Sequence, residues 1–311
     1  MRQRAPLAGL GLALLAALLT APAPLEAAKF YRWTDRNGVT YYGDRPPDVE
    51  IPPDAQLEVV PFRNPKGTLV RLRLVNQGLR YQAWADNSLH GPVEVVLRYK
   101  KRNNVSSAPT LPAHAILPAR RGVLVANVSL VDPMRASGFE LVLDALPGDP
   151  KAEPDLDYAY RLPFEYGRVR IDQGFGGTFS HGDPQNYHAL DFAVDIGTPI
   201  VAVRDGVVMQ VESDFEKAGL NRERYGGRAN FIRILHDDGS MALYAHLQWD
   251  GVLVRAGQHV RAGQRIGLSG NTGFTTGPHL HFVIQVNRGM RLESIPFRMF
   301  GPLGELKPSR L

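Results

Sequence analysis

Short stretches of alternating apolar and polar residues dominate the chain between residues 57 and 150. Clear examples are Leu69–Leu74, Val93–Arg98 and Val123–Val128, and turn-forming residues such as Asn103-Asn104 separate them. Alternation with a period of two is typical of strands that bury one face. A succession of about seven such strands predicts a β-sandwich of immunoglobulin-like type over residues 57–150.

The same kind of pattern continues through residues 157–311. Gly206–Val211 and Phe231–Leu235 are further apolar strand candidates, and no segment carries a long apolar stripe with the 3.6-residue period of a helix. The polar, proline-containing stretch Gly148–Pro154 marks the boundary between the two parts. We therefore expect a mostly-β protein whose C-terminal domain is built on an antiparallel sheet.

The N-terminal residues divide into a targeting segment and a small module. Two arginines precede the apolar run Leu7–Leu19, which is short for a membrane span and typical of a cleaved signal peptide over residues 1–28. Asn37-Gly38 lies between two aromatic stretches and predicts a β-hairpin. Two proline pairs follow, so residues 29–53 form a hairpin module with a stiff linker. This unit resembles a short N-terminal module common in proteobacterial envelope proteins.

Composition limits the chemistry that the chain can perform. The chain has no cysteine and a formal net charge of +5. It therefore has no disulfide, no lipoprotein attachment cysteine and no thiolate ligand, so any metal must be held by histidine and carboxylate side chains. The excess of positive charge favours an anionic partner such as the cell wall. Secretion argues against nucleic acid as a partner, and no transmembrane span is expected after signal cleavage.

The run Gly277-Pro278-His279-Leu280-His281-Phe282 is the strongest chemical signal in the sequence. Its two histidines are one residue apart in an apolar, strand-like stretch, so they point to the same face of the strand. That spacing suits a metal ligand beside a partner that handles protons.

Three further motifs accompany this run. They are Ser269-Gly270-Asn271-Thr272-Gly273, Leu243-Tyr244-Ala245-His246-Leu247, and Ala189-Leu190-Asp191-Phe192-Ala193 followed by Gly197-Thr198-Pro199. Together they resemble the lysostaphin-type (LytM-type) zinc metallopeptidases, and the resemblance covers roughly residues 157–300. It implies a β-rich catalytic domain, a bound Zn²⁺ ion and hydrolysis of peptide cross-links in bacterial peptidoglycan.

The resemblance also implies a set of metal ligands. The family uses an early histidine, an aspartate soon after it, and the second histidine of the H-x-H pair, which here assigns Asp191 and His281. Most members place the first histidine four residues before the aspartate, where this chain has Tyr187. His188 would leave an extended strand on the opposite face, so we favour His181, which the turn at residues 182–184 can present.

Proton handling is assigned by the same resemblance to His246 and His279. The chain has no H-E-x-x-H helix, so the glutamate base of thermolysin-like enzymes is absent. A neutral imidazole with an ordinary pKa near 6.5 suits either general-acid or general-base chemistry near neutral pH.

The leading hypothesis is therefore a zinc-dependent endopeptidase of peptidoglycan in the periplasm or outside the cell. The sequence does not specify the bond that is cut; for a Gram-negative host, which the N-terminal module suggests, the D,D cross-link is the expected target. The alternative is a catalytically weak or inactive LytM-type factor that binds the wall and activates another hydrolase. A biotinyl-lipoyl-like carrier is disfavoured, because Lys217 lacks the flanking residues of a modified lysine. Peptidoglycan is the expected partner, with room for a regulatory envelope protein that controls access to the groove.

Overall fold

The computed structural model describes residues 31–34, 40–43 and 69–306, except residues 79, 133, 136, 166–168 and 226. The expected signal peptide (1–28) and the proline-rich linker lie outside the described residues. The expected hairpin is confirmed in its strands, because β1 (Tyr31–Thr34) pairs antiparallel with β2 (Thr40–Gly43).

Seven strands then form two antiparallel sheets. They are β3 (Val70–Asn76), β4 (Arg80–Asn87), β5 (Val93–Asn103), β6 (Val105–Ala108), β7 (Ala113–Leu117), β8 (Gly122–Leu130) and β9 (Gly138–Pro147). One sheet has the order β3-β4-β8-β6 and the other β7-β5-β9. Alternating side chains from both sheets, such as Ala83 and Ala85 on β4 and Val95 and Leu97 on β5, share one apolar core. This strand order is not the ABED/CFG order of an immunoglobulin domain, so the immunoglobulin-like detail is not confirmed.

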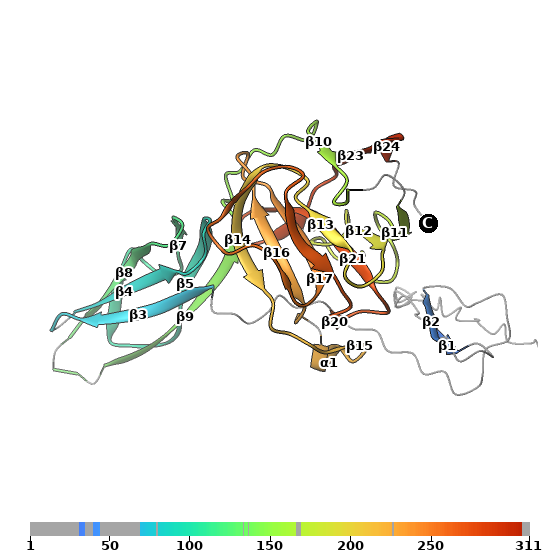
Figure 1. Cartoon of the computed structure of the whole chain (residues 1–311). Helices are drawn as coiled ribbons and strands as arrows, with labels where there is room; N and C mark the ends of the chain where they lie inside the picture. Colours follow the sequence, from blue (N-terminus) through green and yellow to red (C-terminus); the bar gives the residue numbers. More distant parts are fainter. Residues whose placement is uncertain are drawn as a thin grey trace, which may run out of the picture.

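The C-terminal part is built on a larger, mainly antiparallel sheet, drawn in yellow to red in Figure 1. Its main path runs β11-β12-β21-β17-β16-β14-β18. The bounds of these strands are β11 (Arg170–Gln173), β12 (Leu190–Ala193), β14 (Gly206–Glu212), β16 (Asn230–Leu235), β17 (Met241–Val252), β18 (His259–Val260) and β21 (His279–Asn287).

Shorter elements complete this part. β13 (Pro199–Val201), β19 (Arg265–Ser269) and β22 (Leu292–Ser294) attach to the large sheet, and β15 (Ala218–Gly219) pairs with β20 (Gly273–Phe274). β10 (Ala159–Arg161), β23 (Arg298–Gly301) and β24 (Gly304–Leu306) form a small separate sheet. Among the described residues the only helix is α1 (Arg222–Tyr225), so none there is long and apolar enough to span a membrane.

The two faces of the large sheet have different roles. One face carries large side chains into the main core, among them Ile232, Tyr244 and Phe282. Residues one position away along the same strands, such as Leu243 and Val283, form a smaller apolar cluster on the opposite face. The candidate site lies on this second face, because Asp191 and His281 alternate with core residues in the same way.

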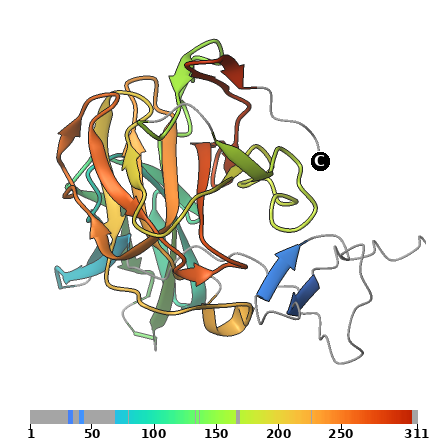
Figure 2. The ribbon, with the colours of Figure 1, turned by 45° about the vertical axis from the view of Figure 1, so that its right-hand side comes forward.

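The sandwich docks against the C-terminal part, and its cyan and teal strands lie beside the large sheet in Figure 1 and behind it in Figure 2. The backbone N–H of His90 donates to the Met209 carbonyl at 3.1 Å, and Met209 and Met241 belong to the apolar core of the sandwich. The buried Glu94 carboxylate accepts from the Asn287 side chain at 2.9 Å and from the Met290 backbone at 2.7 Å. Polar and apolar contacts therefore join the two parts.

Candidate active site

Strand pairing places two of the expected metal ligands face to face. Asp191 on β12 lies directly opposite His281 on β21 in the antiparallel register. The His281 Nδ1 atom is 2.8 Å from Asp191 Oδ1. This juxtaposition follows from the pleat, because directly opposite residues in an antiparallel pair project from the same face.

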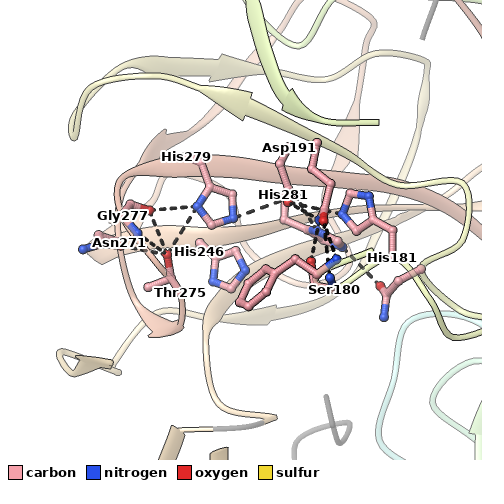
Figure 3. A network of polar contacts seen from close by, with 12 residues as sticks. Ser180, His181, Asp191, His246, Asn271, Thr275, Gly277, His279 and His281 are labelled. Atoms are coloured by element: carbon pink, nitrogen blue, oxygen red, sulfur yellow. Dashed lines mark hydrogen bonds and ion pairs between the residues drawn. The ribbon is translucent and has the colours of Figure 1, made fainter. Parts of the chain in front are cut away.

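The third expected ligand arrives on the loop between β11 and β12. The loop folds back through turn bonds such as His181 N–H to the Gly177 carbonyl. It brings His181 Nε2 to 3.2 Å from Asp191 Oδ2. Gln173, at the end of β11, holds this arrangement: its Nε2 donates to Asp191 Oδ2 at 3.0 Å, and its Oε1 accepts from the Phe179 backbone at 3.1 Å. Potential ligand atoms of His181, Asp191 and His281 all lie within 4.8 Å of one another (Figure 3).

The hydrogen bonds of His181 and His281 identify which ring nitrogen of each has a free lone pair. His181 Nδ1 is 2.8 Å from the Gly174 carbonyl, which only accepts, so Nδ1 carries the proton and Nε2 presents a lone pair. His281 Nε2 is 3.2 Å from Asn186 Oδ1, and the amide nitrogen of Asn186 already donates to Asp183. His281 therefore donates from Nε2 and presents its Nδ1 lone pair toward Asp191.

These tautomers fit a metal ion. They leave lone pairs of two neutral imidazoles directed at a carboxylate, and His181 Nε2 is buried without a hydrogen-bond donor. A cation between the three groups satisfies all of them, and two histidines with one carboxylate are a common catalytic metal set. The carbonyl and amide groups behind the imidazoles are the outer contacts that usually orient such ligands.

His188 lies elsewhere. Its Nδ1 is 3.0 Å from the Ser294 carbonyl, and its ring packs edge-on against Phe175, 5.2 Å between centroids. Phe175 packs against the main core, on the face of the sheet opposite to Asp191. The structure therefore brings His181, and not His188, to Asp191 and His281.

His246 reaches the site through a bulge in β17. Asn230 pairs with Leu247 but the next residue, Phe231, pairs with Ala245, so His246 is the extra residue of the bulge. Its φ of 63° is in the left-handed region, which non-glycine residues seldom adopt. Regular alternation would place His246 on the face opposite to Ala245. The bulge instead brings its ring to 4.6 Å from that of His279, centroid to centroid.

The loop between β19 and β21 orients both of these histidines. His246 Nδ1 donates to the Thr272 carbonyl at 2.7 Å, and His279 Nδ1 donates to the Gly277 carbonyl at 2.8 Å. The Thr275 hydroxyl lies 3.3 Å from His279 Nδ1 and supports the same loop (Figure 3). Each ring therefore keeps Nε2 free, and His279 Nε2 is 3.8 Å from Asp191 Oδ1.

Burial and charge set the ionisation of these groups. Burial, together with nearby His279 and His281, lowers the pKa of His246 to about 3, so this ring is neutral at pH 7. Burial by itself raises the pKa of Asp191, but neighbouring histidines outweigh it and hold that pKa well below its ordinary value. Burial also lowers the pKa of His281. Burial by itself lowers the pKa of His181, but the Asp191 carboxylate outweighs it and raises that pKa above its ordinary value. A metal ion that binds here therefore finds a carboxylate ready to coordinate it and displaces any second proton from the His181 ring.

The sequence interpretation did not single out Gln173 or Asn186. Both are buried, and both touch a candidate ligand. Neither belongs to a spacing motif, because each acts through a loop whose path the sequence does not reveal. The one sequence feature near either residue was the turn at residues 182–184, whose Asp183 carboxylate accepts a hydrogen bond from the Asn186 amide.

Comparison with known proteins identifies two family matches. Residues 185–292 match the model of Peptidase family M23, and residues 15–66 match a domain of unknown function, DUF4124. The first match contains Asp191, His246, His279 and His281, and begins four residues after His181. The second covers the N-terminal hairpin module.

Named relatives share the C-terminal part. Peptidoglycan DD-endopeptidase ShyA of Vibrio cholerae is 40% identical over 117 residues, which are 34% of this chain and 24% of the relative. Lysostaphin of Staphylococcus simulans is 39% identical over 132 residues, 41% of this chain and 22% of the relative. The chain thus spans about a quarter of the length of these curated relatives.

One solved structure covers the shared part more fully. The catalytic domain of lysostaphin from Staphylococcus simulans is 33% identical, and the alignment covers 39% of this chain and 78% of that domain, with a TM-score of 0.26. The family assignment rests on the match of residues 185–292 to the family model and not on this superposition. The C-terminal part of this chain therefore belongs to peptidase family M23.

Proposed function

We propose that this chain is a zinc-dependent endopeptidase that hydrolyses peptide cross-links of peptidoglycan. The observation that carries the proposal is the convergence of five side chains on one face of the sheet: His181, Asp191, His246, His279 and His281. His181, Asp191 and His281 are the proposed metal ligands. His246 and His279 are the proposed proton-handling groups.

The proposed cofactor is Zn²⁺, held by His181 Nε2, His281 Nδ1 and the Asp191 carboxylate. Two imidazoles and one carboxylate with no thiolate match the ligands that catalytic zinc prefers, and three protein ligands leave a further position for the reaction. When bound, zinc supplies Lewis acidity to the scissile carbonyl and makes water acidic enough to attack near neutral pH.

The chain's own groups then move the protons. His246 Nε2 keeps its lone pair free, because Nδ1 carries the ring proton, so Nε2 can accept a proton from the attacking water. His279 Nε2 faces the same space, 3.8 Å from Asp191, and when it also carries a proton it can donate a hydrogen bond to the carbonyl oxygen on which negative charge develops. The proton that His246 accepts from the water can then pass to the leaving amine. Because each Nδ1 is tied to a backbone carbonyl, neither ring needs to reorient between these steps.

The proposed substrate is the D,D cross-link between stem peptides. The support is the relative named peptidoglycan DD-endopeptidase, together with an N-terminal module that resembles those of proteobacterial envelope proteins. We assign residues 1–28 to a signal peptide, 29–53 to the hairpin module and linker, 57–150 to the sandwich and 157–311 to the peptidase domain, with a periplasmic or secreted location. A purely wall-binding role is less well supported, since relatives with such roles lose zinc ligands and this chain keeps a complete set.

Digestion of purified sacculi tests the proposal. Zinc-loaded protein that starts at Lys29 is incubated with sacculi, and the released fragments are separated and identified by mass. We expect cross-linked dimers to be converted into monomers with intact glycan strands. Unchanged dimers after prolonged digestion at several pH values would contradict the proposed activity.

Two variants test the proton-handling roles. His246→Ala and His279→Ala are each expected to keep zinc and to lower turnover by roughly 10²- to 10⁴-fold, the usual range for removing an acid–base group. The exposed His259 provides the matched control, because His259→Ala removes an imidazole outside the site. Loss of zinc from His246→Ala would show that this residue is a ligand.

A further inference from the structure

Arg233 is a buried cation with no carboxylate beside it. It lies on β16 and is 3% exposed. Its Nη1 donates to Gln285 Oε1 at 2.7 Å, while its Nε is buried without a hydrogen-bond partner. Burial lowers the pKa of Arg233 to about 10, and no acidic group among the described residues counteracts that effect. The guanidinium stays charged at pH 7 but most of its donor capacity is unused.

Such an arrangement is unfavourable unless something else binds the cation. A buried charge that lacks a counter-charge carries a large desolvation penalty, and an apolar side chain of similar volume would be easier to accommodate. Three neighbouring positions on this face, Phe231, Leu243 and Val283, are apolar, so an apolar side chain would have fitted the surroundings of Arg233. Arg233 therefore calls for a ligand that supplies negative charge.

Arg233 lies on the same face of the sheet as the candidate active site. In the strand register Arg233 is opposite Leu243, which is opposite Val283. The neighbouring row, two residues along each strand, ends at His281. His281 is two strands away from Arg233 in the sheet and two residues farther along the strand direction. With the usual spacing between strands and rise per residue, their Cα atoms are about 12 Å apart. An extended peptide covers that distance in about three to four residues.

Arg233 also contacts the loop that carries the site. Gln285, the acceptor for Arg233, donates from its Nε2 to the Gln185 carbonyl at 2.8 Å. The next residue, Asn186, contacts His281. One short chain of contacts thus joins the guanidinium to the metal-ligand loop, and a ligand at Arg233 would touch the same segment.

We propose that Arg233 binds a free carboxylate of the substrate peptide, about three residues from the scissile bond. A carboxylate takes the place of Gln285 Oε1 and pairs with two N–H groups of the guanidinium, the geometry that arginine favours. The proposal rests on the proposed peptidoglycan endopeptidase function and adds a residue that determines specificity. The expected ligand is an acidic stem peptide, and a peptide whose carboxyl groups are amidated binds more weakly.

Binding of a single stem peptide tests the proposal without cleavage, since a single stem contains no cross-link. The probes are synthetic L-Ala-γ-D-Glu-meso-diaminopimelyl-D-Ala and the same peptide with amidated carboxyl groups, titrated calorimetrically into the zinc-loaded protein. We expect the wild type to bind the free acid roughly 10- to 100-fold more tightly, as two charge-assisted hydrogen bonds allow. Arg233→Met abolishes this preference, and Arg233→Lys retains part of it.

Arg261→Met is the matched control, because Arg261 is an exposed arginine of the same domain. Thermal unfolding separates a binding role from a structural one: Arg233→Met is expected to be at least as stable as the wild type, because the variant removes an uncompensated charge. An unchanged preference in Arg233→Met would overturn the proposal, whatever its stability. Failure of the proposed function appears differently, as intact dimers in sacculi alongside an intact carboxylate preference.

Discussion

At the scale of single residues, the hydrogen bond that one nitrogen of each imidazole donates fixes the tautomer, and so leaves the other nitrogen with a free lone pair. His181 and His281 donate from one ring nitrogen to a carbonyl or amide oxygen and direct the other toward Asp191. His246 and His279 donate from Nδ1 to backbone carbonyls and keep Nε2 free. The four rings thus have fixed tautomers without an ionised partner other than Asp191.

The sharpest prediction at this scale concerns the first metal ligand. His181→Ala is expected to lose the metal and all activity, because it removes a lone pair that faces Asp191 at 3.2 Å. His188→Ala is the matched control: it should keep the metal and at most part of its rate should be lost, since its imidazole bonds to Ser294. Elemental analysis of both purified variants measures the difference, and the reverse result would assign the ligand to His188.

At the scale of elements, the loop from Gly270 to Pro278 orients the imidazole rings of His246 and His279. It supplies the carbonyls that hold His246 and His279, and it packs closely against β17. A Cβ atom on Gly270 would lie 2.2 Å from the Gln248 backbone nitrogen. Glycine at this position therefore lets the loop approach the strand that contains the bulge.

Gly270→Ala is accordingly expected to displace the loop. We expect a loss of roughly 1–3 kcal/mol in the free energy of unfolding, as overpacking usually causes, and a fall in turnover larger than stability alone explains. Gly277→Ala in the same loop is the control, because a Cβ there meets nothing within 4 Å. Denaturant unfolding and sacculus digestion of both variants measure the two effects. Equal behaviour of the two variants would contradict this account of the loop.

The hairpin between β16 and β17 carries a further buried histidine, His236, which is not one of the proposed metal ligands. Its Nδ1 donates to the Asp205 carbonyl at 2.7 Å, and its Nε2 is buried without a hydrogen-bond partner. Burial lowers the pKa of His236 to about 4. The folded protein therefore keeps this ring neutral at pH values where the unfolded chain protonates it.

This difference predicts a pH dependence of stability. Between about pH 6.5 and pH 4, His236 is protonated in the unfolded state but not in the folded state. The free energy of unfolding therefore falls as the pH is lowered through that window. His236→Gln lacks this group and should lose less stability, by on the order of 2–3 kcal/mol over the window. Urea unfolding at pH 7 and pH 4.5 compares the two proteins. Parallel curves would show that His236 protonates equally in both states.

At the scale of the whole molecule, hydrogen bonds and apolar contacts cross the boundary between the sandwich and the peptidase domain. Glu94 of the sandwich is 6% exposed and accepts hydrogen bonds from Asn287 and Met290 of the peptidase domain. Met209 and Met241 extend the apolar core of the sandwich across the boundary. Of these contact residues, Met241 and Asn287 lie on β17 and β21, the strands that carry His246 and His281, while Met209 lies on β14. The sandwich is therefore placed near one end of the site face.

Glu94→Ala is expected to weaken that coupling. It leaves the buried Asn287 amide and the part-buried Met290 N–H without their acceptor, and an unsatisfied buried donor usually costs about 1–3 kcal/mol. We expect a single thermal transition to separate into two, with the sandwich unfolding first. Glu140→Ala removes a carboxylate at the far end of the sandwich whose side chain is 42% exposed, and it is the control. Differential scanning calorimetry shows the transitions, and one unchanged transition in Glu94→Ala would mean that the apolar contacts alone couple the two parts.

The residue pattern by itself determined the nature of the fold. Alternation predicted strands in both parts, because burial of one face is a local property of a strand and is visible in the sequence. The motifs around Asp191, His246 and the H-x-H pair carry the resemblance to lysostaphin-type peptidases, because they are local in the sequence. The immunoglobulin-like detail was not confirmed, because strand order depends on long-range pairing that alternation does not encode.

Tertiary structure decided how the candidate site is assembled. Alternation alone would turn His246 away from the site, and only the bulge opposite Asn230 and Phe231 reverses its direction. The route by which His181 returns to Asp191, and the support from Gln173 and Asn186, depend on the folded path of one loop. Arg233 reads in the sequence as an ordinary strand residue. Its isolation from every carboxylate of the described chain is a property of three neighbouring strands and the loop above them, so no local pattern could reveal it.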